Sequence, residues 1–331
     1  MGRRLDALTF GPARRGHRMR KRLAELDRAD ARLRAAGIDP IDEWLRQQDP
    51  RMNTGPTRPI KESSGAGRIV LLLLVLLVVG YVAVHHFQAA PGTAAATGFA
   101  RPDNLPPVSS EEQPQPLGTP LPAPAGDGGY AFEATQPGSS APAAWDPCRP
   151  IHYVTNGAAP AGEEGVVASV LAELTRITGF RFVDDGPTTE VPQATNRAEY
   201  QPALYGTRWA PVLVAWTDPT HVPRLTGPVI GLGGADSITF AGSPRTLVSG
   251  LVYFDAPQFR ANLADPRGRA RQRAEMRAVV RHEFGHLLGL AHVGDPRAIM
   301  YPETHLNVTD YSPADLRGLH ALSVGPCAPT L

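Results

Sequence analysis

The stretch HEFGHLLGLAH, residues 282–292, carries the most specific pattern in this chain of 331 residues. Apolar residues recur at helical spacing before it, so the stretch is expected to close an amphipathic helix. His282 and His286 are four residues apart, and both imidazoles therefore project from one helix face and can share a metal ion. Gly289 can take a positive φ, which ends the helix and returns the chain so that His292 supplies a third ligand. Three histidines with one open position predict a catalytic zinc site rather than a closed structural one.

Glu283 follows the first of these histidines and is expected to be a general base rather than a ligand. A carboxylate in this place predicts hydrolysis by an activated water. The alternative, from another functional class, is a catalytically silent domain that binds an extracellular partner. An intact Glu283 favours the enzyme, because a domain that only binds has no need of a base.

The same residues resemble a known family. HEFGHLLGLAH is similar to the HExxHxxGxxH pattern of the metzincin metallopeptidases, and IMYP at residues 299–302 resembles their Met-turn. The form Met-Tyr-Pro, eight residues after His292, is similar to matrixins, the matrix-metalloproteinase-like group. The resemblance extends over about residues 148–331, but its specific part is residues 282–302.

The resemblance implies an α+β fold, with a twisted mixed sheet, an active-site helix and a small C-terminal subdomain after Gly289. It also implies that one catalytic zinc ion is bound by three histidines, that Glu283 is the general base and that Met300 supports the site from below. The family resemblance implies a protein or peptide as the substrate, and Tyr301 and Pro302 would form a wall of the substrate pocket. The implied zinc ligands are His282, His286 and His292.

The chain also departs from the matrixin pattern. Val293 stands where matrixins usually have Ser or Thr after the third histidine, and neither a loop for a second, structural zinc nor the PRCGxPD cysteine switch is recognisable. We therefore expect a single zinc ion. Calcium binding stays open and has no support in the sequence.

An unbroken apolar run, IVLLLLVLLVVGYVAV, occupies residues 69–84. Extended to residue 87, it is long enough to cross a bilayer as a helix, which we prefer to a buried core helix. A cleaved signal peptide is disfavoured because 68 residues precede the run. Residues 1–68 carry 16 Lys and Arg against 9 Asp and Glu, whereas residues 85–331 carry a net negative charge. The positive-inside rule then predicts a single-pass protein of the cell membrane, with a cytoplasmic N-terminus and an extracellular catalytic domain.

The basic arm over residues 1–68 is expected to form short helices on the anionic inner leaflet, with weak binding to a cytoplasmic partner as the alternative. Residues 88–147 contain 12 Pro and 7 Gly and are expected to be a disordered linker. Over the whole chain, 33 Lys and Arg nearly balance 32 Asp and Glu, which argues against a nucleic-acid partner.

The folded domain is expected over residues 148–331. Runs rich in β-branched and aromatic residues predict strands, and helical spacing predicts two helices. A strand–helix–strand start favours a mixed sheet with parallel pairs, and glycines at 228–235 suit an edge strand approached by another backbone. Arginines around the second helix favour a solvated face over a nucleic-acid or lipid surface. The expected strands are 151–154, 181–183, 212–216 and 248–254, and the expected helices are 163–178 and 271–288.

Two cysteines, Cys148 and Cys327, open and close this domain. An even pair on the outer side of a membrane predicts one disulfide that joins the two ends of the domain. The alternative is that one thiolate caps the zinc and keeps the enzyme latent.

Overall fold

The computed structural model describes residues 101–331 except 127–128, 194–196, 241, 265, 267 and 304–306. The expected cytoplasmic arm and the expected span over residues 69–87 lie outside the described residues. Across the described ranges, no helix is both long and apolar enough to cross a membrane.

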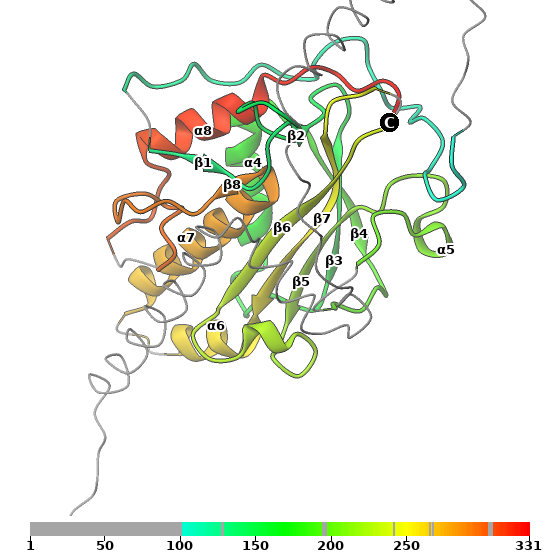
Figure 1. The fold of residues 1–331 in the computed structure, drawn as a ribbon. Helices are drawn as coiled ribbons and strands as arrows, with labels where there is room; N and C mark the ends of the chain where they lie inside the picture. Colours follow the sequence, from blue (N-terminus) through cyan, green and yellow to red (C-terminus); the bar gives the residue numbers. More distant parts are fainter. Residues whose placement is uncertain are drawn as a thin grey trace, which may run out of the picture. The chain divides into compact units, whose positions relative to one another are not determined.

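A six-stranded sheet forms the centre of the fold, with the order β2-β7-β5-β3-β4 and with β6 paired to β7 (Figure 1). The pairs within the ordered path are parallel, and only β6 runs antiparallel to its neighbour. The sheet is therefore mixed and mainly parallel, in agreement with the mixed sheet that the sequence predicts. Its strands are β2 (Ala144–Trp145), β3 (Ile151–Asn156), β4 (Phe182–Pro187), β5 (Val212–Thr217), β6 (Gly231–Ile238) and β7 (Thr246–Asp255).

The helices α4, α7 and α8 lie together on one side of the sheet (Figure 1). Alternation along β5 explains this layering, since successive side chains of a strand point to opposite faces. Val212 and Val214 join the core beneath the helices, whereas Leu213 and Ala215 pack in a second cluster on the other face. The helices are α4 (Val166–Thr178), α5 (Pro202–Tyr205), α6 (Ala256–Leu263), α7 (Arg269–Leu288) and α8 (Pro313–Ser323), with a short 3₁₀ turn η2 (Pro223–Leu225).

The active-site helix α7 is anchored to α4 by a buried arginine. Arg281 donates to both carboxylate oxygens of Glu173 in α4 and to the carbonyl oxygen of Thr309. Tyr311 Oη donates in turn to the carbonyl oxygen of Arg281. Arg281 therefore differs from the solvated face expected for the arginines of this helix, because its guanidinium is buried and paired.

Residues 131–145 differ from the disordered linker expected over 88–147. β1 (Ala131–Phe132) pairs antiparallel with β8 (Leu290–Ala291), and β2 pairs parallel with β7. Trp145 is buried, and its Nε1 donates to the carbonyl oxygen of Leu287 in α7. One tryptophan and two short pairings thus fix this Pro- and Gly-rich segment to the sheet and to the active-site helix.

The chain end is joined to the start of β3 by the Cys148–Cys327 disulfide. The Asp146 carboxylate braces the same junction, since it accepts from the backbone N–H groups of Cys148 and Ala328. Both cysteines are therefore held in one disulfide, and the cap alternative, in which a thiolate faces the zinc, is not what the structure contains.

Candidate active site

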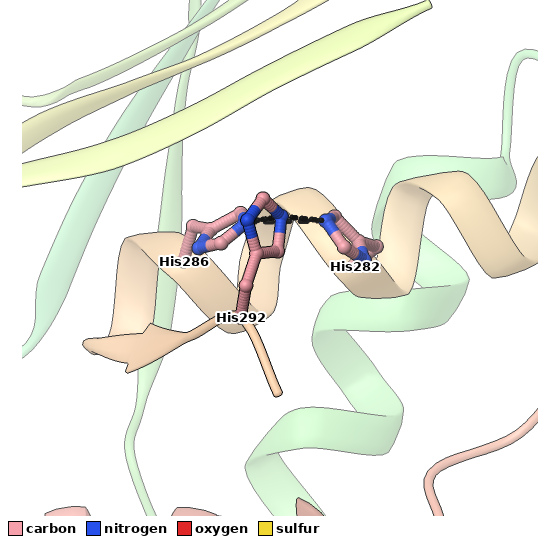
Figure 2. Close-up of side chains that lie close together, drawn as sticks. All are labelled: His282, His286 and His292. Carbon is pink, nitrogen blue, oxygen red and sulfur yellow. Dashed lines mark hydrogen bonds between the residues drawn. The ribbon is translucent and has the colours of Figure 1, made fainter. Parts of the chain in front are cut away.

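Three histidine side chains converge at the end of α7 (Figure 2). The Nε2 atoms of His282, His286 and His292 lie 3.1 Å from one another in every pair. His282 and His286 project from adjacent turns of α7, as a spacing of four predicts. Gly289 takes φ 111° at the end of the helix, so the chain reverses into β8 and brings His292 back to the other two.

The donor set fits a zinc ion. His282 Nδ1 donates to the carbonyl oxygen of Ile299 at 2.7 Å and His286 Nδ1 donates to that of Leu290 at 2.8 Å. Because a carbonyl only accepts, both protons lie on Nδ1 and the bare Nε2 atoms face each other. Nitrogens 3.1 Å apart are close to the separation of two ligands on one tetrahedral zinc, whose bonds to nitrogen are about 2.0–2.1 Å long. Burial also lowers the pKa of His282 to about 3, which keeps it in the neutral form that binds metals.

Glu283 lies beside the histidines without joining them. Its side chain is buried against β6, and a Cβ built on Gly231 would lie 2.6 Å from Glu283 Oε1. Burial raises the pKa of Glu283 to about 7. A carboxyl with that pKa can both accept and return a proton near neutral pH, which is the property of a general acid–base group.

The turn that follows the histidines lies directly beneath them. Met300 is fully buried, and its Sδ would lie 2.4 Å from a Cβ built on Gly285, so the thioether packs against the helix between the two ligands. Val293 N donates to the carbonyl oxygen of Met300 and closes the loop. The resemblance to matrixins implies such support by Met300. The close packing of Met300 also explains why residue 285 has no side chain.

Asp315 of α8 fixes this turn from the far side. Its Oδ2 accepts from the backbone N–H groups of Ile299 and Ser312, and the latter contact completes a capping box at the start of α8. Since the carbonyl oxygen of Ile299 holds His282, Asp315 reaches the metal centre through a single residue. Ser312 and Asp315 have the spacing of a capping box, but nothing in that spacing predicts the contact with Ile299.

Two glycines of β6, Gly231 and Gly233, allow α7 to pack closely against the strand. A Cβ built on Gly233 would lie 2.1 Å from the carbonyl oxygen of Glu283, whereas one built on Gly234 would meet nothing within 4 Å. The backbone of the active-site helix approaches this face of the strand closely. The opposite edge of β6 has no partner strand among the described residues.

We expect Gly233→Ala to lower the free energy of unfolding by about 1–3 kcal/mol, because strand and helix must separate to admit the methyl group. Gly234→Ala is the matched control, with the same substitution one residue away in open space. Chemical denaturation of both variants checks this result. Equal stabilities would show that the contact between β6 and α7 is not tight.

The expected pocket residues follow the turn. Tyr301 is half-buried and Pro302 is exposed, so both lie at the surface next to the buried Met300. Leu287 is fully buried and packs toward Gly250 of β7, so it does not belong to this surface.

Comparison with known proteins agrees with this geometry. Residues 215–323 match the model of the family described as Matrixin. These residues are therefore similar to the matrixin metalloproteases. Human neutrophil collagenase is 34% identical over 99 residues, which cover 28% of this chain and 20% of the collagenase. Rabbit (Oryctolagus cuniculus) macrophage metalloelastase is 32% identical over 99 residues, covering 29% of this chain and 19% of the relative.

The chain thus spans about a fifth of the length of the curated relatives that it matches. Among solved structures, an archaemetzincin from Methanopyrus kandleri is similar over 51% of this chain and 91% of its own, with 17% identity and a TM-score of 0.32, a likeness too weak to support an argument.

The matched residues include every residue that the sequence assigns to the zinc site, from His282 to Met300. The resemblance to matrixins is therefore confirmed, and so is zinc as the metal of the three histidines. Strands β1 to β4 and helix α4 precede the matched residues, yet they complete the sheet and the support of α7.

Proposed function

We propose that this protein is a membrane-anchored, zinc-dependent endopeptidase that cleaves proteins or peptides outside the cytoplasm. One observation carries the proposal: three converging Nε2 atoms lie beside Glu283, a buried carboxyl that is not a ligand. A purely structural zinc site has four protein ligands and does not need a base.

Different residues would bind the metal and transfer the proton during hydrolysis. The three histidines would hold zinc, which would supply Lewis-acid chemistry at the substrate carbonyl. Glu283 takes a proton from the attacking water at its carboxylate oxygen and later gives it to the leaving amine. Burial of Glu283 supports this exchange, because it raises the pKa of the carboxyl toward the range in which general acid–base groups work.

The free edge of β6 supports an extended substrate. β6 lies next to α7 and pairs on one side only, with β7, among the described strands. A peptide added along the other edge would bond through its main chain, which gives affinity that tolerates many sequences. The substrate's scissile bond would then lie close to Glu283, since Gly231 of this strand contacts that side chain.

Specificity is expected to depend on the loop after Met300. The Tyr301–Pro302 surface is largely apolar, so we expect an apolar residue immediately after the cut. One methylene group in such a pocket is worth only about 1–3 kcal/mol, and the preference should therefore be graded. A cleavage-site profile from a peptide library, recorded for the wild type and for variants of residues 303–306, measures this preference.

The matched control for these variants is Glu164→Gln, an exposed residue before α4. A profile dominated by charged residues after the cut, or one that none of the changes at 303–306 alters, would place the pocket elsewhere.

Anchoring in the membrane is supported by the apolar run at residues 69–84 and by the basic residues before it. The disulfide supports an oxidising compartment, in which such bonds persist. Protease added to intact cells should therefore degrade or release the domain while the N-terminal arm stays protected. Recovery of the whole protein in the soluble fraction after an alkaline wash would contradict the anchor.

A further inference from the structure

The short strand β1, which precedes the residues matched by the matrixin family, supports the part of the chain between His286 and His292. β1 pairs with β8, and the register places Ala131 opposite Ala291 and Phe132 opposite Leu290. The backbone N–H of Glu133 then donates to the carbonyl oxygen of Gly289 at 2.9 Å. β8 lies between His286 and His292 in the chain, so this pairing supports the return that brings His292 to the site.

The side chain of Glu133 continues from this strand to the metal centre. Its Oε1 lies 3.1 Å from His286 Nδ1, the nitrogen that also donates to the carbonyl oxygen of Leu290 at 2.8 Å. The Nδ1–H of His286 thus donates to a carbonyl, and a carboxylate oxygen lies close to the same nitrogen. His286 itself is buried, whereas the Glu133 side chain is 52% exposed at the rim of the site.

The two helix-borne ligands therefore differ in their support. The structure gives His282 Nδ1 a backbone carbonyl as its acceptor, that of Ile299, and gives His286 Nδ1 a carbonyl together with a negative charge. A carboxylate behind a ligating imidazole fixes its tautomer and ring orientation and makes the opposite nitrogen a better ligand.

We propose that Glu133 is a positioning residue of the zinc site, which acts through His286 and raises the affinity for zinc. Residues of this kind typically change metal affinity by about 10–100-fold. Because half of the Glu133 side chain is exposed, water screens its charge, and we expect about tenfold. The inference rests on the zinc site of the proposed peptidase and does not require that the protein cleave peptides.

The test compares Glu133→Ala and Glu133→Gln with the wild type in the full chain. Glu275→Gln is the matched control, since it removes one acidic charge from α7 at an exposed ion pair with Arg271. The measurement is the zinc dissociation constant, from competition with a chromophoric chelator, together with the melting temperature of the metal-free protein. The visible absorption spectrum of the cobalt-substituted protein reports the geometry of the three histidines.

We expect Glu133→Ala to bind zinc about tenfold more weakly and Glu133→Gln to lie between it and the wild type, because an amide oxygen still accepts from Nδ1 but carries no charge. The metal-free melting temperature should stay unchanged, since the pairing of β1 with β8 uses backbone groups only. The cobalt spectrum of Glu133→Ala should shift, and the Glu275→Gln control should match the wild type in all three measurements.

Zinc affinities within twofold of one another in all four proteins would overturn the inference. A weaker affinity accompanied by an equal loss of stability in the metal-free protein would also overturn it, because Glu133 would then act on the fold alone. If the wild type binds zinc but cleaves nothing, the proposed function fails and this comparison still holds. If the wild type cleaves peptides and Glu133→Ala binds zinc normally, the inference fails by itself.

Discussion

Glu283→Gln is expected to abolish peptide cleavage while the protein keeps its zinc ion. The amide has nearly the same shape as the carboxyl, so the packing against Gly231 should persist. It cannot accept a proton from water, and the loss of a general base typically costs about 10²–10⁴-fold in rate. Metal analysis of the purified variant and its kcat on a peptide substrate provide the two measurements.

His282→Ala is the companion variant, because it removes a ligand and should lose both zinc and activity. Glu275→Gln on the same helix serves as the control and should keep both. If Glu283→Gln lost its zinc, Glu283 would be part of the coordination and its role as a base would be wrong.

Removal of the disulfide is expected to lower the free energy of unfolding by about 3–5 kcal/mol. Cys148 and Cys327 are 179 residues apart, and a bond that closes so long a loop restricts the unfolded chain strongly. The zinc site should survive in a Cys148→Ser, Cys327→Ser double variant at low temperature, because neither residue touches the histidines. Denaturant titration of the oxidised wild type and of the double variant gives the difference.

Mass spectrometry of a non-reduced digest tests the same bond directly. It should recover the peptides of Cys148 and Cys327 linked to each other. Two free thiols, or activity that rises on alkylation, would contradict the structure and support a cysteine that covers the zinc.

The zinc site could be predicted from the sequence because its residues lie within one helix and the turn that follows. Spacing alone places His282 and His286 on one face, and Gly289 needs only its positive φ to bring back His292. The central strands of the sheet could be predicted equally well. All residues of β5 are buried, and such a strand reads as a continuous apolar run.

The supports of the site could not be predicted in the same way, because they depend on contacts between distant residues. β1 and β2 contain two residues each, too few for a periodic pattern, and they occur in a Pro- and Gly-rich segment. Glu133 reaches His286 across more than 150 residues of chain, and Asp315 holds Ile299 from another helix. The segment around residue 133 has few large apolar residues, as its composition indicates. Composition does not show that a buried tryptophan, Trp145, helps to fix the segment to the core.

Digestion of a mixed peptide library by the full-length protein, with and without a zinc chelator, tests the central claim most directly. The account predicts cleavage at internal peptide bonds, its loss when the chelator removes zinc, and its return when zinc is added back. A protein that binds one zinc ion at the three histidines but cleaves no peptide under any of these conditions would contradict the account, and would identify the domain as a binding module.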